Sequence, residues 1–125
     1  MLFFSFGNRA FNKECSESNI YIIISPKQSH ESPFQFLEKA IEFVDEKIYP
    51  GEDFKSDYAG IKLIEGNYEN IVMKWISSMS QSIEICFDDI QNVHRIKCNN
   101  SDPYRDEFLI ETNEEYIIFL WSTTA

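Results

Sequence analysis

The fold is decided by residues 32–51, which read SPFQFLEKAIEFVDEKIYPG. Ser32 can cap a helix, Pro33 suits its first position, and Gln35 completes a capping box. A proline–glycine pair at the end of the run stops the helix. We therefore predict an amphipathic helix over about residues 33–48 that packs on one face of a sheet, because its apolar face is too wide to stand alone in water. The residues at helical spacing on that face are Phe34, Leu37, Ile41, Val44 and Ile48.

Most of the remaining chain has the pattern of β-strands. Residues 20–24 and 116–121 are continuous β-branched and aromatic runs, which are typical of central strands covered on both faces. Residues 108–111 and 116–121 predict a hairpin around 112–115. Short connections favour an antiparallel sheet, so the predicted fold class is α+β, in a single domain over residues 1–125. The other predicted strands are 2–6, 61–65, 83–87 and 93–98, and the predicted polar loops are 52–60 and 99–106.

Residues 68–79 fit two structures. Tyr68, Val72 and Trp75 belong to a helical stripe. Ile71, Met73 and Trp75, however, alternate as in a strand and are flanked by turn signals. We favour a strand here and keep a second helix as the alternative.

Charge is the most distinctive global property of the chain. Twenty-one acidic residues against eleven basic ones give 125 residues a net charge of −10. A field of this sign repels nucleic acid and anionic membrane surfaces, and it attracts a basic partner. It also keeps a small protein soluble, which is the simpler explanation of the same charge.

The termini and cysteines indicate a compartment. The apolar run at residues 1–6 has no preceding basic residue, and no stretch approaches the roughly 18 apolar residues of a membrane span. Cys15, Cys86 and Cys98 are odd in number and widely spaced, which fits a reducing interior. We therefore expect a cytoplasmic protein that has no membrane association.

Motifs for catalysis or cofactor binding are lacking. The four glycines form no phosphate loop or dinucleotide fingerprint, and the cysteines have no zinc-site spacing, so no cofactor or metal is expected. His30 is interpreted as a solvated loop residue. His94 and Cys98 would share one face of a strand, and Asp88-Asp89 lie at a strand end, so a small enzyme using these residues stays an alternative. The favoured interpretation is that the protein is not an enzyme.

Two acidic clusters that contain aromatic residues, at residues 42–58 and 102–116, are the best candidate for a functional surface. Carboxylates would steer a basic protein toward the surface and a tyrosine would anchor it. Reversing the charges of Asp53, Asp57, Asp106 and Glu107 is expected to slow association and leave the fold stable. The predicted partner-binding residues are Glu52, Asp53, Asp57, Tyr58, Asp102, Tyr104, Asp106 and Glu107.

These features favour an inhibitor of a basic enzyme, above all a nuclease, because a nuclease presents cationic side chains to phosphate. As a small, strongly acidic, aromatic-rich α+β domain, the chain resembles bacterial immunity proteins of the contact-dependent and polymorphic-toxin type. The resemblance implies a cognate toxin as the partner and no turnover. A structural or adaptor domain that self-associates through an exposed strand edge remains a second alternative, so both a monomer and a homodimer are open.

Overall fold

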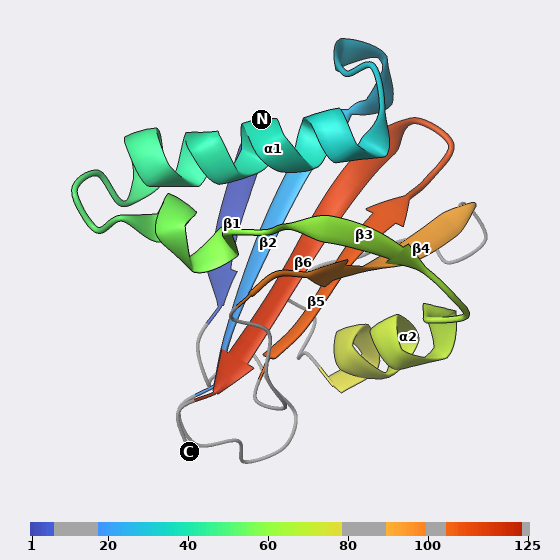
Figure 1. Ribbon diagram of the computed structural model, residues 1–125. Helices are drawn as coiled ribbons and strands as arrows, with labels where there is room; N and C mark the ends of the chain where they lie inside the picture. Colours follow the sequence, from blue (N-terminus) through green and yellow to red (C-terminus); the bar gives the residue numbers. More distant parts are fainter. Residues whose placement is uncertain (7–17, 79–89, 100–104, 124–125) are drawn as a thin grey trace.

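The computed structural model describes residues 1–6, 18–78, 90–99 and 105–123 (Figure 1). Within these ranges, six strands form one antiparallel sheet in the order β1-β2-β6-β5-β4-β3, with a helix packed on it, which confirms the predicted α+β class. The predicted strand at 83–87 lies outside the described residues. The strands are β1 (Leu2–Phe6), β2 (Ser18–Pro26), β3 (Lys62–Glu65), β4 (Asn92–Lys97), β5 (Arg105–Glu111) and β6 (Glu115–Thr123).

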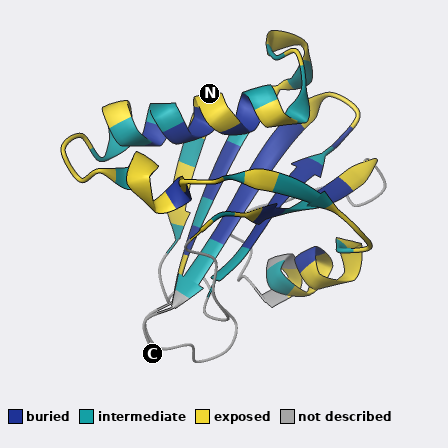
Figure 2. Cartoon of the chain, in the orientation of Figure 1, coloured by how far each residue is buried: buried dark blue, intermediate teal, exposed yellow. Residues whose placement is uncertain are grey.

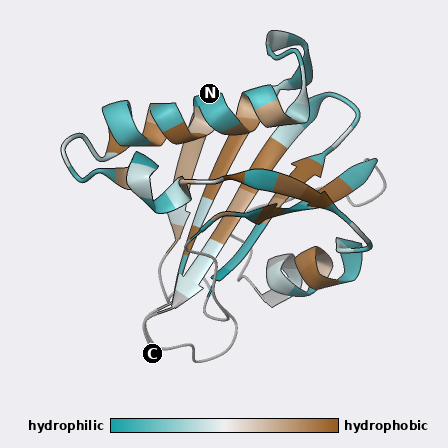
Figure 3. Ribbon diagram, viewed as in Figure 1, coloured by the Kyte–Doolittle hydropathy of each residue, from teal (hydrophilic) through white to brown (hydrophobic). Residues whose placement is uncertain are grey.

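The two runs predicted to be central, β2 and β6, lie inside the sheet and pair from Ser18–Thr123 to Pro26–Glu115. Their side chains alternate between two cores. Ile22 belongs to one core and Ile23 to the other, and both are buried. The two strands are accordingly mostly dark blue in Figure 2 and brown beneath the long helix in Figure 3. Continuous apolar runs form here because both faces of the strands are covered.

The predicted helix over 33–48 is confirmed. It consists of α1 (Pro33–Phe43) and a final π-helical segment, η3 (Val44–Ile48). The backbone N–H of Gln35 donates to the Ser32 hydroxyl at 3.1 Å, which is the expected N-cap. The Gln35 side chain does not complete a capping box, because its carbonyl accepts from the backbone N–H of Glu31 at 3.2 Å. The helix residues buried against the sheet include Phe36, Leu37, Ala40, Ile41 and Val44.

A second helix covers the core that contains Ile22. The prediction of a strand at residues 68–79 was therefore wrong. The helix is α2 (Glu69–Ser78). Val72 is fully buried in this core, and Tyr68 and Trp75 pack against it at helical spacing. Two of the three alternating residues that suggested a strand are instead exposed, Ile71 by 38% and Met73 by 37%. None of the helices in the described part of the chain is long and apolar enough to cross a membrane.

The strand β5 begins earlier than predicted. Residues 99–106 were predicted to be a loop, but Arg105, Asp106 and Glu107 pair with β6 opposite Ser122, Trp121 and Leu120. Successive residues of a strand point to opposite faces. Asp106 therefore lies on the α2 side of the sheet and Glu107 on the α1 side. This placement determines the roles of both carboxylates.

Candidate functional site

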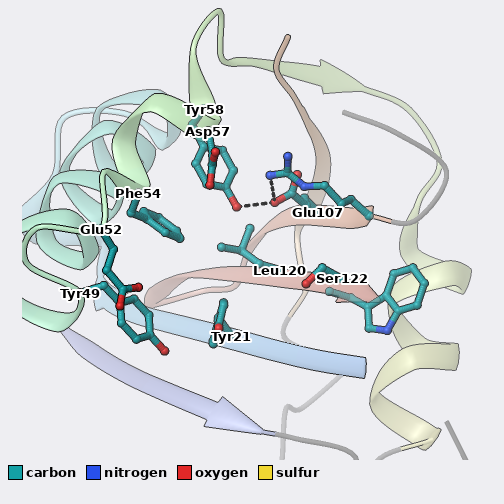
Figure 4. A pocket seen from close by; sticks show the side chains of 11 residues that line it. Tyr21, Tyr49, Glu52, Phe54, Asp57, Tyr58, Glu107, Leu120 and Ser122 are labelled. Atoms are coloured by element: carbon teal, nitrogen blue, oxygen red, sulfur yellow. Dashed lines mark hydrogen bonds and ion pairs between the residues drawn. The ribbon is translucent and has the colours of Figure 1, made fainter. Parts of the chain in front are cut away.

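A pocket of about 610 Å³ opens where β5 begins and β6 ends, on the α1 side of the sheet (Figure 4). Its base includes Tyr21 of β2 and Leu120 of β6. Its outer wall comes from the segment 49–58, which follows the helix and includes the short 3-10 helix η4 (Phe54–Tyr58). Secondary structures far apart in the sequence thus meet around one cavity.

The outer wall is formed by a sharp reversal of the chain after the helix. Gly51 has φ +84° and Asp53 has φ 56°, so both lie in the left-handed region that favours glycine and, more rarely, aspartate. The Asp45 carboxylate then accepts a hydrogen bond from the backbone N–H of Lys55 at 2.9 Å. The reversal brings Glu52 and Asp57 to the pocket.

A buried charged group, formed by Tyr58, Arg105 and Glu107, joins the outer wall to β5. The Tyr58 hydroxyl donates to Glu107 Oε2 at 2.6 Å, and Arg105 Nη2 donates to the same oxygen at 3.0 Å. The Arg105 guanidinium also lies 5.0 Å from the centre of the Tyr58 ring. The Glu107 side chain is only 3% exposed, so this carboxylate is a buried acceptor of two hydrogen bonds. It holds η4 against β5.

Burial and charge act together on these groups. Burial first, and then the charge of Glu107 and its hydrogen bond, raise the pKa of Tyr58 well above its ordinary value. Burial by itself would lower the pKa of Arg105, but Glu107 and Tyr58 raise it above its ordinary value overall. Arg105 therefore remains a cation beside Glu107, and Tyr58 remains a neutral donor.

Aromatic rings stand on two sides of the cavity. Tyr21 and Tyr49 have centroids 6.0 Å apart on one side, and Phe54 and Tyr58 have centroids 5.1 Å apart on the other. Glu52 and Asp57 line the same pocket as these rings (Figure 4). The site therefore combines carboxylates with aromatic faces.

Tyr21 gives the pocket a measurable signature. Burial, a hydrogen bond with Tyr49 and the negative charge of Glu52 raise the pKa of Tyr21 from 10.0 to about 12. The folded state thus holds this proton more tightly than the unfolded chain does. The resulting stabilisation is fully present below pH 10.0 and is lost as pH rises through about 12.

An alkaline titration followed by ultraviolet absorbance checks this value. We expect the wild-type protein to show a phenol that ionises near pH 12 and Tyr21→Phe to lack that late step. Identical titration curves for the two proteins would contradict the assignment. Unfolding by urea at pH 9 and pH 11, measured on both proteins, then reports the linked loss of stability.

The structure brings together half of the predicted partner-binding residues. Glu52, Asp57, Tyr58 and Glu107 all line the pocket. Tyr58 and Glu107, however, are 7% and 4% exposed, so they support the wall and are not surface anchors. The expectation that reversing the charge of Glu107 leaves the fold stable is corrected, because the reversal would place a cation beside Arg105.

The other predicted residues lie elsewhere. Asp53 is exposed at the turn and is not part of the pocket lining. Asp106 faces the other side of the sheet, where it accepts hydrogen bonds from Trp75 Nε1 at 3.0 Å and Arg95 Nη2 at 3.3 Å. This carboxylate ties α2 to the sheet. Asp102 and Tyr104 lie outside the described residues.

Tyr21 and Arg105 were not predicted to be site residues. Tyr21 is the one residue with a polar tip in the isoleucine-rich run 20–24, which was the available signal. Arg105 is the lone cation in its acidic cluster, but its partners Tyr58 and Glu107 become apparent only in the fold.

The residues considered for an enzyme have other surroundings. His94 lies on β4, and its Nδ1 atom is buried with no hydrogen-bond partner in the described ranges. The Cys98 thiol donates to the backbone carbonyl of Asp57 at 3.4 Å. Asp88 and Asp89 lie outside the described residues. The described residues contain no group of three or more His, Cys, Asp or Glu side chains that could hold a metal ion.

His30 is not a solvated loop residue, as the sequence suggested. Its Nε2 lies 2.7 Å from the Ser25 hydroxyl, and its Nδ1 lies 3.2 Å from Gln35 Oε1. This order of groups is that of a nucleophile, a base and an orienting amide. Ser25 is only 4% exposed, however, and the His30 ring packs 5.0 Å from Phe36. The three side chains therefore connect the end of β2 to the start of α1.

Comparisons of the chain with protein-family models, curated proteins and solved structures found no match. The pocket must therefore be interpreted from its own chemistry. Its lining holds three carboxylates, those of Glu52, Asp57 and Glu107, against the single guanidinium of Arg105. A formal charge of −2 inside a wall of aromatic rings favours a cationic ligand.

Proposed function

We propose that this protein is a non-catalytic acidic binding protein, and specifically an immunity protein that neutralises a basic toxin with a nuclease domain. The observation that supports this most is the acidic, aromatic pocket. The exposed residues Glu52 and Asp57 both line this pocket, and the hydrogen bond between Tyr58 and Glu107 supports its wall. A rigid wall with accessible carboxylates is suited to recognising a basic surface.

The chemistry of a nuclease explains why such a surface would inhibit it. A nuclease binds phosphates through Lys and Arg side chains. Carboxylates held on a folded domain can occupy those side chains in place of the substrate. The net charge of −10 would also speed the encounter with a basic protein. Neither step requires turnover by the inhibitor.

The proposal is tested by capture and inhibition. The tagged protein is incubated with its native cell lysate and washed at low and high salt, and the retained protein is identified by mass. We expect one basic protein, retained at low salt, whose nuclease activity falls to zero at a one-to-one ratio. An acidic retained protein, no retained protein, or undiminished nuclease activity at excess inhibitor would contradict the proposal.

Self-association is a second candidate, favoured by the strand β1. This strand forms one edge of the described sheet, and Leu2 and Phe4 on it are 58% and 40% exposed. It carries no charged residue, whereas β3 at the opposite edge carries Lys62 and Glu65. Uncharged apolar edges favour pairing with another strand.

Light scattering after size exclusion tests this second candidate. If β1 forms a dimer interface, the wild-type protein elutes as a dimer and Phe4→Lys elutes as a monomer. The exposed residue Met73 of α2 supplies the control, since Met73→Lys should leave the dimer intact. A monomeric wild-type protein at high concentration would exclude this candidate and leave the pocket proposal unaffected.

A further inference from the structure

We propose that the pocket receives an arginine side chain of the basic partner, an inference that rests on the proposed function and identifies the group that its site recognises. The partner's arginine is the proposed occupant. A lysine side chain and a free small-molecule guanidinium compound are the alternatives that the experiment distinguishes.

Charge and accessibility support a cationic occupant. Three carboxylates line a cavity of about 610 Å³, and the single guanidinium among them, that of Arg105, is already paired with Glu107. Glu52 and Asp57 are exposed, so an entering side chain can reach both. The cavity lies between the segment 49–58 and the strands (Figure 4).

The buried group of Tyr58, Arg105 and Glu107 already provides an example of how the protein binds a guanidinium. Arg105 lies over the Tyr58 ring at 5.0 Å from its centre and donates to Glu107 at 3.0 Å. One aromatic face and one carboxylate thus hold one planar cation. This arrangement is the pattern to look for in the rest of the cavity.

The outer wall of the pocket also has aromatic faces and carboxylates. The rings of Tyr49 and Phe54 line it together with the carboxylates of Glu52 and Asp57. A guanidinium is planar, can stack on a ring and can pair with a carboxylate through two parallel hydrogen bonds. The ammonium group of lysine is a compact, strongly hydrated charge and uses such a site less fully. Arginine is therefore the preferred residue.

Amide NMR spectra of the full chain test the inference with three probes. These are N-acetyl-arginine amide, N-acetyl-lysine amide and N-acetyl-citrulline amide, the last having the shape of arginine without its charge. We expect arginine amide to shift the resonances of pocket residues such as Tyr21 and Ser122, more strongly than lysine amide does. Citrulline amide at the same concentration should leave them unchanged. Equal shifts with arginine and citrulline amides, or stronger shifts with lysine amide, would overturn the inference.

A pair of matched variants locates the binding. Glu52→Gln with Asp57→Asn should weaken binding of arginine amide by roughly five- to tenfold, as expected for losing two partly solvated ion pairs. Glu38→Gln with Glu65→Gln, which removes the same charge from exposed positions outside the pocket lining, should leave the affinity unchanged. An equal loss in both variants would mean that only net charge matters, and would overturn the inference.

A competition experiment separates this inference from the proposed function. Arginine amide, but not citrulline amide, should release the basic protein captured from lysate. The captured protein could instead stay bound while arginine amide fills the pocket. That result would overturn the partner's arginine as the occupant and would indicate that the site binds a free guanidinium compound. A captured and inhibited nuclease with no effect of arginine amide on either spectrum or capture would refute the inference and leave the proposed function standing.

Discussion

Replacing Glu107 with alanine is expected to lower the free energy of unfolding by about 3–5 kcal/mol, which is the usual cost of breaking a buried charged pair. The Glu107 side chain is only 3% exposed and accepts from both Tyr58 and Arg105. Without it, the Arg105 guanidinium, on a side chain that is 16% exposed, and the hydroxyl of the buried Tyr58 lose their common acceptor. Urea unfolding, followed by circular dichroism, measures the loss.

Two companion variants define the cause of that loss. Glu107→Gln keeps the size and an acceptor oxygen but removes the charge, so we expect a smaller loss, of about 1–3 kcal/mol. Glu115→Ala removes an exposed carboxylate from the neighbouring strand β6 and should change stability by no more than about 0.5 kcal/mol. A loss in Glu107→Ala no larger than that in Glu115→Ala would show that the buried group does not support the pocket.

Reversing Glu52 and Asp57 together to lysine is expected to slow association with the basic partner by about tenfold or more at low salt, since like charges would then meet across the encounter surface. Both residues are exposed, so the fold should persist. Stopped-flow measurement of the association rate at two ionic strengths tests this. The difference from wild type should shrink at high salt because exposed charges are screened.

The control for this prediction changes the net charge equally. Glu38→Lys with Glu65→Lys reverses two exposed carboxylates outside the pocket lining, so both double variants move the net charge from −10 to −6. We expect the control to slow association much less, because the local field at the pocket is unchanged. Equal slowing by both variants would indicate that the overall charge, and not the pocket, attracts the partner.

The fold could be predicted where its signals are local. The cap at Ser32, the helical spacing after it and the continuous apolar runs of β2 and β6 each identify an element without knowledge of the rest. Residues 68–79 were predicted wrongly because their apolar residues fit both the helical period and the strand period. Only the position of the sheet decides that Val72 is covered and Met73 is not.

The charged start of β5 could not be predicted, because the residues that donate hydrogen bonds to its carboxylates include ones distant in sequence. A run containing Arg105, Asp106 and Glu107 has the composition of a loop. Glu107 accepts a hydrogen bond from Tyr58, 49 residues away, and Asp106 accepts one from Trp75, 31 residues away. Charges that are neutralised inside the fold look the same in a sequence as charges that face water.

The candidate site could be predicted only in part, because some of its residues come together only through contacts between distant parts of the sequence. Glu52 and Asp57 could be named because exposed acidic clusters are visible in the sequence. The pocket itself depends on the reversal at Gly51 and Asp53, which folds η4 over the end of the sheet. Tyr21 entered the site only through that long-range contact, since its local sequence indicates a strand and nothing more.

The most direct test of the central claim, that the acidic pocket selects a basic partner, is capture from one native lysate by three proteins side by side. These are the wild type, the Glu52→Lys, Asp57→Lys variant and the Glu38→Lys, Glu65→Lys control. We predict that the wild type and the control retain the same basic protein in equal amounts and that the pocket variant retains almost none. Retention of that protein by the pocket variant at the wild-type level would contradict the claim.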